Sequence, residues 1–203
     1  MKSVWNNQFM KQNYYREKEI SFAHETVEFI KKQNTQNPKL LDLGCGQGQD
    51  SIFFTDNGFQ VTAMDWSKEA LSSIVDKRIK KVCQDMRNLS IFKPKTFDVV
   101  YCVFSIHFFR REEAQKIIDQ IQHVLKPDGV LALIAKSTED KYYGKGQQIT
   151  QHMFIYSNVL RHFFAEKELK EMLKNFKIIS CEEEKHERDG IASYWKVLAI
   201  KQE

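Results

Sequence analysis

The sequence predicts an α/β domain with a mostly parallel, doubly wound sheet, and three observations support this prediction. Short apolar runs alternate with helical segments from residue 38 onward, at the spacing of strand–helix–strand units. Apart from Asp98 the segment Phe97–Phe104 is apolar, which is typical of a strand buried on both faces. The last two apolar runs are joined by a short turn, which only antiparallel strands allow. The length of 203 residues suits a single domain, 1–203, with a full core.

Residues 1–37 precede this alternation and are expected to form an N-terminal helical arm. They show no strand pattern, and the apolar residues after position 20 recur at roughly helical spacing. The stretch Gln33–Pro38 is rich in turn-forming residues and is expected to end the helix.

Residues 38–136 are predicted to form the core of the domain. Its strands are expected at Lys39–Leu43, Gln60–Met64, Lys80–Gln84, Phe97–Phe104 and Val130–Ala135. Its helices are expected at Gln49–Asp56, from the N-cap Ser67 onward, and at Glu112–Leu125. The residues Lys126–Gly129 are expected to form a turn. Parallel sheets bind ligands beyond the carboxyl ends of their strands, so we expect the site there.

The remainder of the chain has a different character. Residues 137–165 have no clear period and are long for a plain loop, so they are expected to cover a site. Residues 166–203 are predicted to form a helix at Glu166–Asn175 and an antiparallel hairpin. The hairpin strands are expected at Lys177–Glu184 and Ser193–Ile200.

Composition argues against several classes of protein. The net charge of +4 is mild, and without a dense basic stripe no nucleic-acid partner is expected. No apolar run approaches the roughly 18 residues of a membrane helix, so no membrane partner is expected either. The four cysteines lack zinc spacing, which predicts no metal and reduced thiols in a cytoplasmic protein.

The strongest local motif is the glycine loop that follows the first predicted strand. Gly44, Gly46 and Gly48 alternate at a strand-to-helix junction, where backbone can approach a ligand closely. A dinucleotide fingerprint would require glycine at position 49, where the sequence has Gln49. Asp42 would oppose a pyrophosphate but favour a cation. S-adenosylmethionine (SAM) carries a sulfonium and an ammonium and no phosphate, so charge favours SAM over a dinucleotide.

Two acidic residues follow the second and third predicted strands. Asp65 can accept hydrogen bonds from a ribose diol, although both nucleotide classes use such an acid, and its alternative role is a helix cap. Asp85 can accept from an adenine amino group, while the Met86 N–H donates to the ring; its alternative is a cap or an exposed loop acid. Trp66 offers an apolar face to the ring, or packs in the core.

Taken together, these segments resemble the class I SAM-dependent methyltransferases. The matching segments are LLDLGCGQGQD, VTAMDWS, CQDMRNL, FDVVYCVFSIHF and VLKPDGVLALI, in the family's order, between residues 40 and 134. The resemblance implies a Rossmann-like, seven-stranded sheet whose last strand is antiparallel. Within this family, the sequence is weakly similar to small stand-alone enzymes of the tellurite-resistance and thiopurine type.

The resemblance also implies roles by position. The implied cofactor-binding residues are Asp42, Gly44, Cys45, Gly46, Asp65, Trp66, Asp85, Met86 and Phe104. An N-terminal arm that carries Trp5, Tyr14 and Tyr15 would fold over the cofactor. The candidate acceptor-binding residues are Tyr14, Ser105, Tyr142 and Tyr143.

His107 is the candidate general base, because it directly follows the fourth strand and its ordinary pKa suits proton transfer. The alternative is a packing histidine among phenylalanines. The stretch after the fourth strand lacks the Pro-containing motifs of nucleic-acid base methyltransferases, which favours a small-molecule acceptor such as a thiol, an oxyanion or an amine. Two other functions stay open: a SAM-binding sensor or accessory subunit without catalysis, and a nicotinamide-dependent oxidoreductase.

Overall fold

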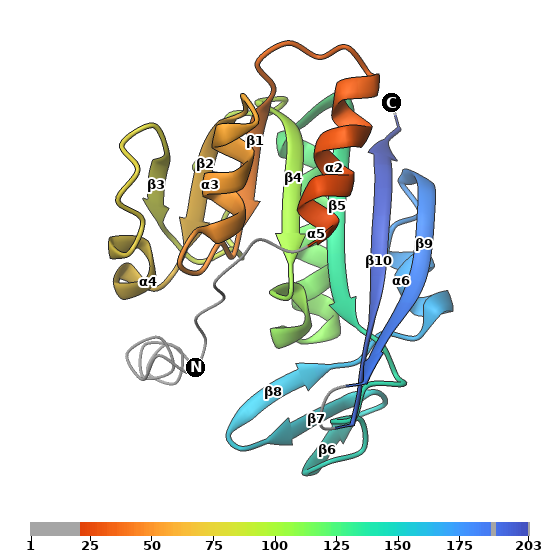
Figure 1. Cartoon of the computed structure of the whole chain (residues 1–203). Helices are drawn as coiled ribbons and strands as arrows, with labels where there is room; N and C mark the ends of the chain where they lie inside the picture. Colours follow the sequence, from red (N-terminus) through yellow and green to blue (C-terminus); the bar gives the residue numbers. More distant parts are fainter. Residues whose placement is uncertain (1–20, 188–189, 203) are drawn as a thin grey trace.

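The computed structural model describes residues 21–187 and 190–202, and its main feature is a seven-stranded sheet (Figure 1). The strand order is β3-β2-β1-β4-β5-β10-β9. The strands are β1 Lys39–Leu43, β2 Gln60–Asp65, β3 Lys80–Cys83, β4 Phe97–Val103, β5 Leu125–Lys136, β9 Phe176–Glu187 and β10 Ile191–Lys201. Strands β1 to β5 pair in parallel, and β10 runs antiparallel to both of its neighbours. The predicted fold class, with its C-terminal hairpin, is confirmed.

Helices cover both faces of this sheet. They are α2 Ser21–Lys32, α3 Gln49–Asp56, α4 Lys68–Ser72, α5 Arg111–Val124 and α6 Glu166–Met172, with a short 3-10 helix η1 at Ile106–Phe108. One apolar cluster joins the sheet to α2, α3 and α4, and a second joins it to α5 and α6. Both faces of β4 are therefore buried, which explains its continuous apolar sequence.

The segment after β5 contains a second sheet that the sequence analysis did not predict. Strands β6 Gln147–Thr150, β7 Met153–Tyr156 and β8 Val159–His162 form an antiparallel sheet below the carboxyl ends of β4 and β5 (Figure 1). Its strands are only four residues long, so alternation was hard to recognise. The signal lay in the turn: Ser157 and Asn158 both have positive φ, as a tight hairpin turn requires.

Several predicted boundaries were wrong. The residues Lys126–Gly129 are not a separate turn but the irregular start of β5, where the partner of Phe97 is Leu125 and the partner of Val99 is Val130. Asp128 takes up the extra length with a φ of 59°. Helix α6 ends at Met172, earlier than predicted, and the terminal hairpin extends further at its turn.

Candidate active site

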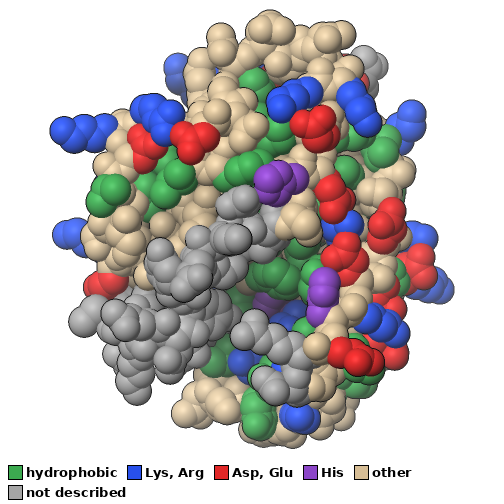
Figure 2. Space-filling model, in the orientation of Figure 1, with side chains coloured by type: hydrophobic (Ala, Val, Ile, Leu, Met, Phe, Trp, Pro, Cys, Tyr) green, Lys and Arg blue, Asp and Glu red, His purple; other side chains and the backbone are tan. Residues whose placement is uncertain are grey.

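A cavity of about 300 Å³ lies at the carboxyl ends of the parallel strands, where a doubly wound sheet binds its ligands. All of the predicted cofactor residues except Asp42 line it, together with Ser105 and His107. Figure 2 shows a hollow on this side of the molecule in which hydrophobic, basic and histidine side chains are visible. The structure therefore gathers residues from four strand ends into one site.

The glycine loop forms one wall of the cavity, and its backbone requires glycine. Gly44 has a φ of 83°, and a Cβ there would lie 2.6 Å from Cβ of Ser105. The hydroxyl of Ser105 donates to the Leu43 carbonyl at 3.0 Å, which joins the ends of β1 and β4. The Gly44 and Cys45 N–H groups donate to the Met64 carbonyl at the end of β2. The loop is thus held between three strands.

Asp42 is not among the residues that line the cavity, and its predicted contact with the cofactor stays a prediction. Its side chain is only 4% exposed, and it accepts a hydrogen bond from the hydroxyl of Ser51 in α3. Its charge still reaches the site, since burial and the neighbouring Asp42 both raise the pKa of the Cys45 thiol in the cavity wall. Asp42 therefore contributes negative potential at the glycine loop.

Asp65 lies in the cavity wall at the end of β2 and is 9% exposed. Burial raises its pKa, against the opposing effect of hydrogen bonds from the N–H groups of Ser67 and Gly46 at 2.8 and 3.0 Å. The helix cap itself is Ser67, whose hydroxyl accepts from Ala70 N–H. Because a carboxylate has about four acceptor sites, Asp65 keeps capacity for a ligand hydroxyl pair.

Asp85 lines the cavity at the end of β3 and is paired with a cation. The Arg87 guanidinium contacts its carboxylate at 2.6 Å and reaches Glu113 at 2.8 Å. Partial burial would raise the pKa of Asp85, but the hydrogen bonds from Arg87 outweigh it and hold that pKa below its ordinary value. The carboxylate is therefore ionised and fixed in place, which suits an acceptor for an amino group.

His107 lies on η1 at the opposite side of the cavity from Asp85's strand. The side chain is 1% exposed, and its Nδ1 has no hydrogen-bond partner among the described residues. Burial, followed by the charges of Lys136 and Arg161, holds the pKa of His107 well below its ordinary value. The imidazole is therefore neutral at physiological pH, which makes it a hydrogen-bond acceptor and a weak base.

The tyrosines proposed for acceptor binding do not line the cavity. Tyr143 packs within the segment that follows β5, where its hydroxyl lies 2.8 Å from Nδ1 of His152. Tyr142 lies beside Lys136, which does line the cavity, at 5.7 Å from the centre of its ring. The prediction for Tyr14, and for the arm residues Trp5 and Tyr15, lies outside the described residues.

Sequence reasoning missed other lining residues, namely Gln47, Gln49, Met64, Gln84, Val103, Phe108, Phe109 and Lys136. Lys136 ends β5, so the rule that ligands bind beyond the carboxyl ends of strands could have found it. Gln47 is the most informative of them, because its side-chain carbonyl is buried and has no partner among the described residues. An unpaired buried acceptor in the cavity wall suits an ammonium donor, so these residues fit SAM.

Fold and site together define a nucleoside-binding α/β domain, and comparison with known proteins shows which family this part of the chain resembles. The profile of a methyltransferase domain matches residues 40–129. A glycine/sarcosine N-methyltransferase from Aphanothece halophytica is 32% identical over 114 residues, which cover 52% of this chain and 43% of that protein. The predicted resemblance to the class I SAM-dependent methyltransferases is confirmed over residues 40–129.

Solved structures share the fold. A 1,6-didemethyltoxoflavin-N1-methyltransferase from Burkholderia thailandensis, solved with S-adenosylhomocysteine, has a TM-score of 0.77 and 18% identity over 100% of this chain and 87% of its own. TehB from Haemophilus influenzae has a TM-score of 0.72 and 20% identity over 97% of this chain and 67% of its own. The aligned part of this chain spans less than half the length of the first curated relatives.

Among the described residues, no helix combines the length and apolar character needed to cross a bilayer. No group of three or more His, Cys, Asp or Glu side chains among them is arranged to hold a metal ion. The cysteines are free thiols, and those at positions 45 and 102 are buried.

Proposed function

We propose that this chain transfers the methyl group of SAM to a small-molecule acceptor. The observation that carries the proposal is a single cavity in which the glycine loop, Asp65 and Asp85 share their space with His107 and Lys136. Residues suited to bind the cofactor and residues suited to bind the acceptor therefore line the same cavity. The similarity to a glycine/sarcosine N-methyltransferase and to a 1,6-didemethyltoxoflavin-N1-methyltransferase supports a small acceptor.

In this proposal the glycine loop and the two acidic residues bind SAM and orient it. Gly44 and Gly46 let the loop backbone approach the methionine end, and Gln47 accepts from its amino group. Asp65 holds the ribose hydroxyls. Asp85, fixed by Arg87, accepts from the adenine amino group.

When bound, SAM supplies an activated methyl group and a neutral leaving group, so the protein's main task is alignment. Phe104 and Phe108 present apolar surface to the reacting region and exclude water from it. Phe104 is held there with a positive φ of 51° and packs edge-on against Tyr194, with ring centroids 5.1 Å apart. A non-glycine residue in this backbone region costs free energy, which the surrounding packing must offset.

His107 then acts on the acceptor rather than on the cofactor. Its neutral imidazole can accept a hydrogen bond from an acceptor N–H or O–H and orient the lone pair toward the methyl group. Because its pKa is low, it would hold a removed proton only briefly, so the acceptor should react as an anion or a free amine.

The deciding experiment is a pair of measurements on the whole chain. Calorimetric titration with SAM and S-adenosylhomocysteine should give micromolar binding of both, whereas no binding of either would overturn the proposal. An acceptor screen over thiols, oxyanions and small amines should then release S-adenosylhomocysteine with at least one class. Binding without turnover on any acceptor would favour the sensor or accessory function instead.

A further inference from the structure

Four cationic side chains among the described residues surround the ring of Tyr142, beside the part of the cavity that is proposed to bind the acceptor. The Nζ atoms of Lys136 and Lys145 lie 5.7 and 5.6 Å from its centroid, and the guanidinium carbon of Arg161 lies at 5.4 Å. Lys141 adds a further ammonium at 5.6 Å. These residues come from the end of β5, from the segment after it and from β8, and the negative face of the ring attracts all of them.

The acidic groups near this cluster are already engaged. Asp140 is fully buried and pairs with Lys136 at 2.7 Å. It also accepts from the N–H groups of Tyr142 and Ser193. Because the Asp140 carboxylate is buried and bonded to these groups, it fixes Lys136 in place. The other cationic side chains leave positive charge in excess around Tyr142.

Arg161 has no ion pair with any described carboxylate. Its Nη1 donates to the Tyr156 and Val159 carbonyls at 2.9 and 3.4 Å, which orients the guanidinium. Its Nε and Nη2 have no hydrogen-bond partner among the described residues. These two atoms form the edge of the planar fork that matches a carboxylate with two parallel hydrogen bonds.

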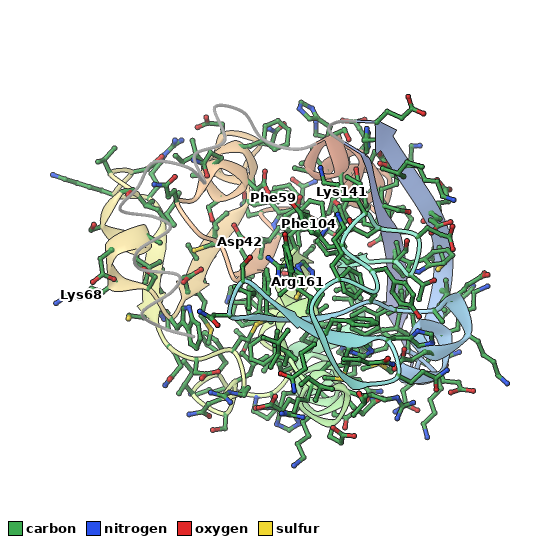
Figure 3. All side chains as sticks on the ribbon, turned by 90° about the horizontal axis from the view of Figure 1, so that it is seen from below. Asp42, Phe59, Lys68, Phe104, Lys141 and Arg161 are labelled. Carbon is green, nitrogen blue, oxygen red and sulfur yellow. The ribbon has the colours of Figure 1, made fainter. Side chains whose placement is uncertain are left out.

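Arg161 and the cavity are linked through η1. Strand β8 packs against η1, and the charges of Lys136 and Arg161 both act on His107, which lines the cavity. In the view of Figure 3, Arg161, Phe104 and Lys141 are labelled near the centre, whereas Lys68 extends from the rim. Besides Nε and Nη2 of Arg161, Nδ1 of the buried His107 also has no hydrogen-bond partner among the described residues.

We propose that Arg161 and Lys136 form an anion subsite that binds a carboxylate of the acceptor, with His107 contacting the same molecule. The inference rests on the proposed function, because it assigns the acceptor end of that cavity. A cationic cofactor would add to the positive potential here, so a carboxylate would be attracted and a cationic acceptor repelled.

Benzoate and benzamide test this proposal because they share a shape and differ in charge. Each is titrated calorimetrically into the full chain, first alone and then saturated with S-adenosylhomocysteine. Wild-type protein should bind benzoate about 10-fold or more tightly than benzamide. Arg161→Gln should weaken benzoate binding about 10- to 100-fold and leave S-adenosylhomocysteine affinity unchanged.

Two further variants control the experiment. Lys68→Gln removes one positive charge from exposed α4 and should behave as wild type. Arg161→Lys keeps the charge without the fork and should give an intermediate benzoate affinity; it also serves if Arg161→Gln fails to fold.

Equal binding of benzoate and benzamide by wild type would overturn the anion subsite, as would an unchanged preference in both Arg161 variants. If S-adenosylhomocysteine fails to bind while the benzoate preference persists, the proposed function falls and the anion subsite stands. The two failures are therefore distinguishable.

Discussion

The two sides of the cavity are built from different kinds of groups. The cofactor side consists of loop backbone and short acids that lie within a few residues of strand ends, namely Gly44, Gly46, Asp65 and Asp85. On the side proposed for the acceptor, Lys136 lines the cavity, whereas Arg161 and Tyr142 do not. The two cationic side chains meet only at the Tyr142 ring, through tertiary packing. The cofactor side carries negative potential and the acceptor side positive potential, so each side should respond to a different set of substitutions.

The largest effect is expected at the glycine loop. Gly44→Ala places a Cβ 2.6 Å from that of Ser105 and keeps a φ of 83° that alanine adopts poorly. We expect SAM affinity to fall by at least about 100-fold, because the loop must shift away from the cofactor. Calorimetric titration with S-adenosylhomocysteine measures this loss.

Gly58→Ala is the matched control. Gly58 has a φ of 87°, but a Cβ there meets nothing within 4 Å. Both variants should lose about 1–2 kcal/mol of stability from backbone strain. Gly44→Ala should lose more because of its clash with Ser105, and only this variant should lose cofactor binding. Similar affinities in the two variants would contradict the role of the loop as a close-approach site.

The next effect is expected at Asp65. Removal of this carboxylate in Asp65→Ala should weaken SAM binding about 10- to 100-fold, since hydrogen bonds to a charged group are lost. Part of the loss would come from Gly46, whose N–H donates to this carboxylate. The exposed Asp56→Ala serves as a control, and an unchanged affinity in Asp65→Ala would remove the ribose assignment.

The same residue should make cofactor affinity depend on pH. Burial raises the pKa of Asp65, so its carboxylate takes up a proton at a less acidic pH than an ordinary aspartate. Affinity for S-adenosylhomocysteine should therefore fall as pH drops from 7 into the acidic range. Asp65→Asn should flatten this part of the profile at a lower affinity, and a parallel decline in both proteins would assign the pH dependence to another group.

On the acceptor side, His107 should affect stability through its proton. Its folded pKa lies well below its unfolded value near 6.5, so the unfolded state binds a proton that the folded state does not. This contribution is present above pH 6.5 and is lost as pH falls from there toward the folded pKa. Between pH 7.5 and 5.5 wild type should lose about 1.4 kcal/mol that His107→Gln and His107→Phe retain.

Urea denaturation at both pH values measures this difference. Equal losses of unfolding free energy in wild type and both variants would show that His107 is accessible to protons in the folded state. A neutral imidazole that resists protonation would instead support its role as a hydrogen-bond acceptor for the methyl acceptor.

The contrast between the two sides also explains what the sequence could predict. Gly44, Asp65 and Asp85 each sit at a strand end, so strand–helix alternation alone placed them at one edge of the sheet. The exception is Asp42, one residue further inside β1. Alternation of side chains across a strand turns it away from the cavity toward Ser51 of α3.

The acceptor side could not be predicted in the same way. Arg161 and His107 are more than 50 positions apart and meet because β8 packs on η1, which depends on a small sheet with four-residue strands. The sequence set residues 137–165 apart as a segment without indicating its strands, and their role as a cover stays a prediction. Tyr142 was expected to line an acceptor pocket, whereas in the structure its ring lies outside the cavity lining and is surrounded by cationic side chains.

The smallest expected effect tests that role of the Tyr142 ring. Tyr142→Leu removes the aromatic face, and each exposed cation–ring contact contributes about 0.5–1 kcal/mol, so benzoate affinity should fall about 2- to 5-fold. Tyr142→Phe keeps the face and should bind benzoate as wild type does. S-adenosylhomocysteine affinity should not change in either variant, because Tyr142 does not line the cavity. If Tyr142→Phe lost as much as Tyr142→Leu, the hydroxyl rather than the ring would be the important group. In that case the two sides of the cavity would still differ in charge. A polar hydroxyl would then organise the acceptor side, much as polar groups organise the cofactor side.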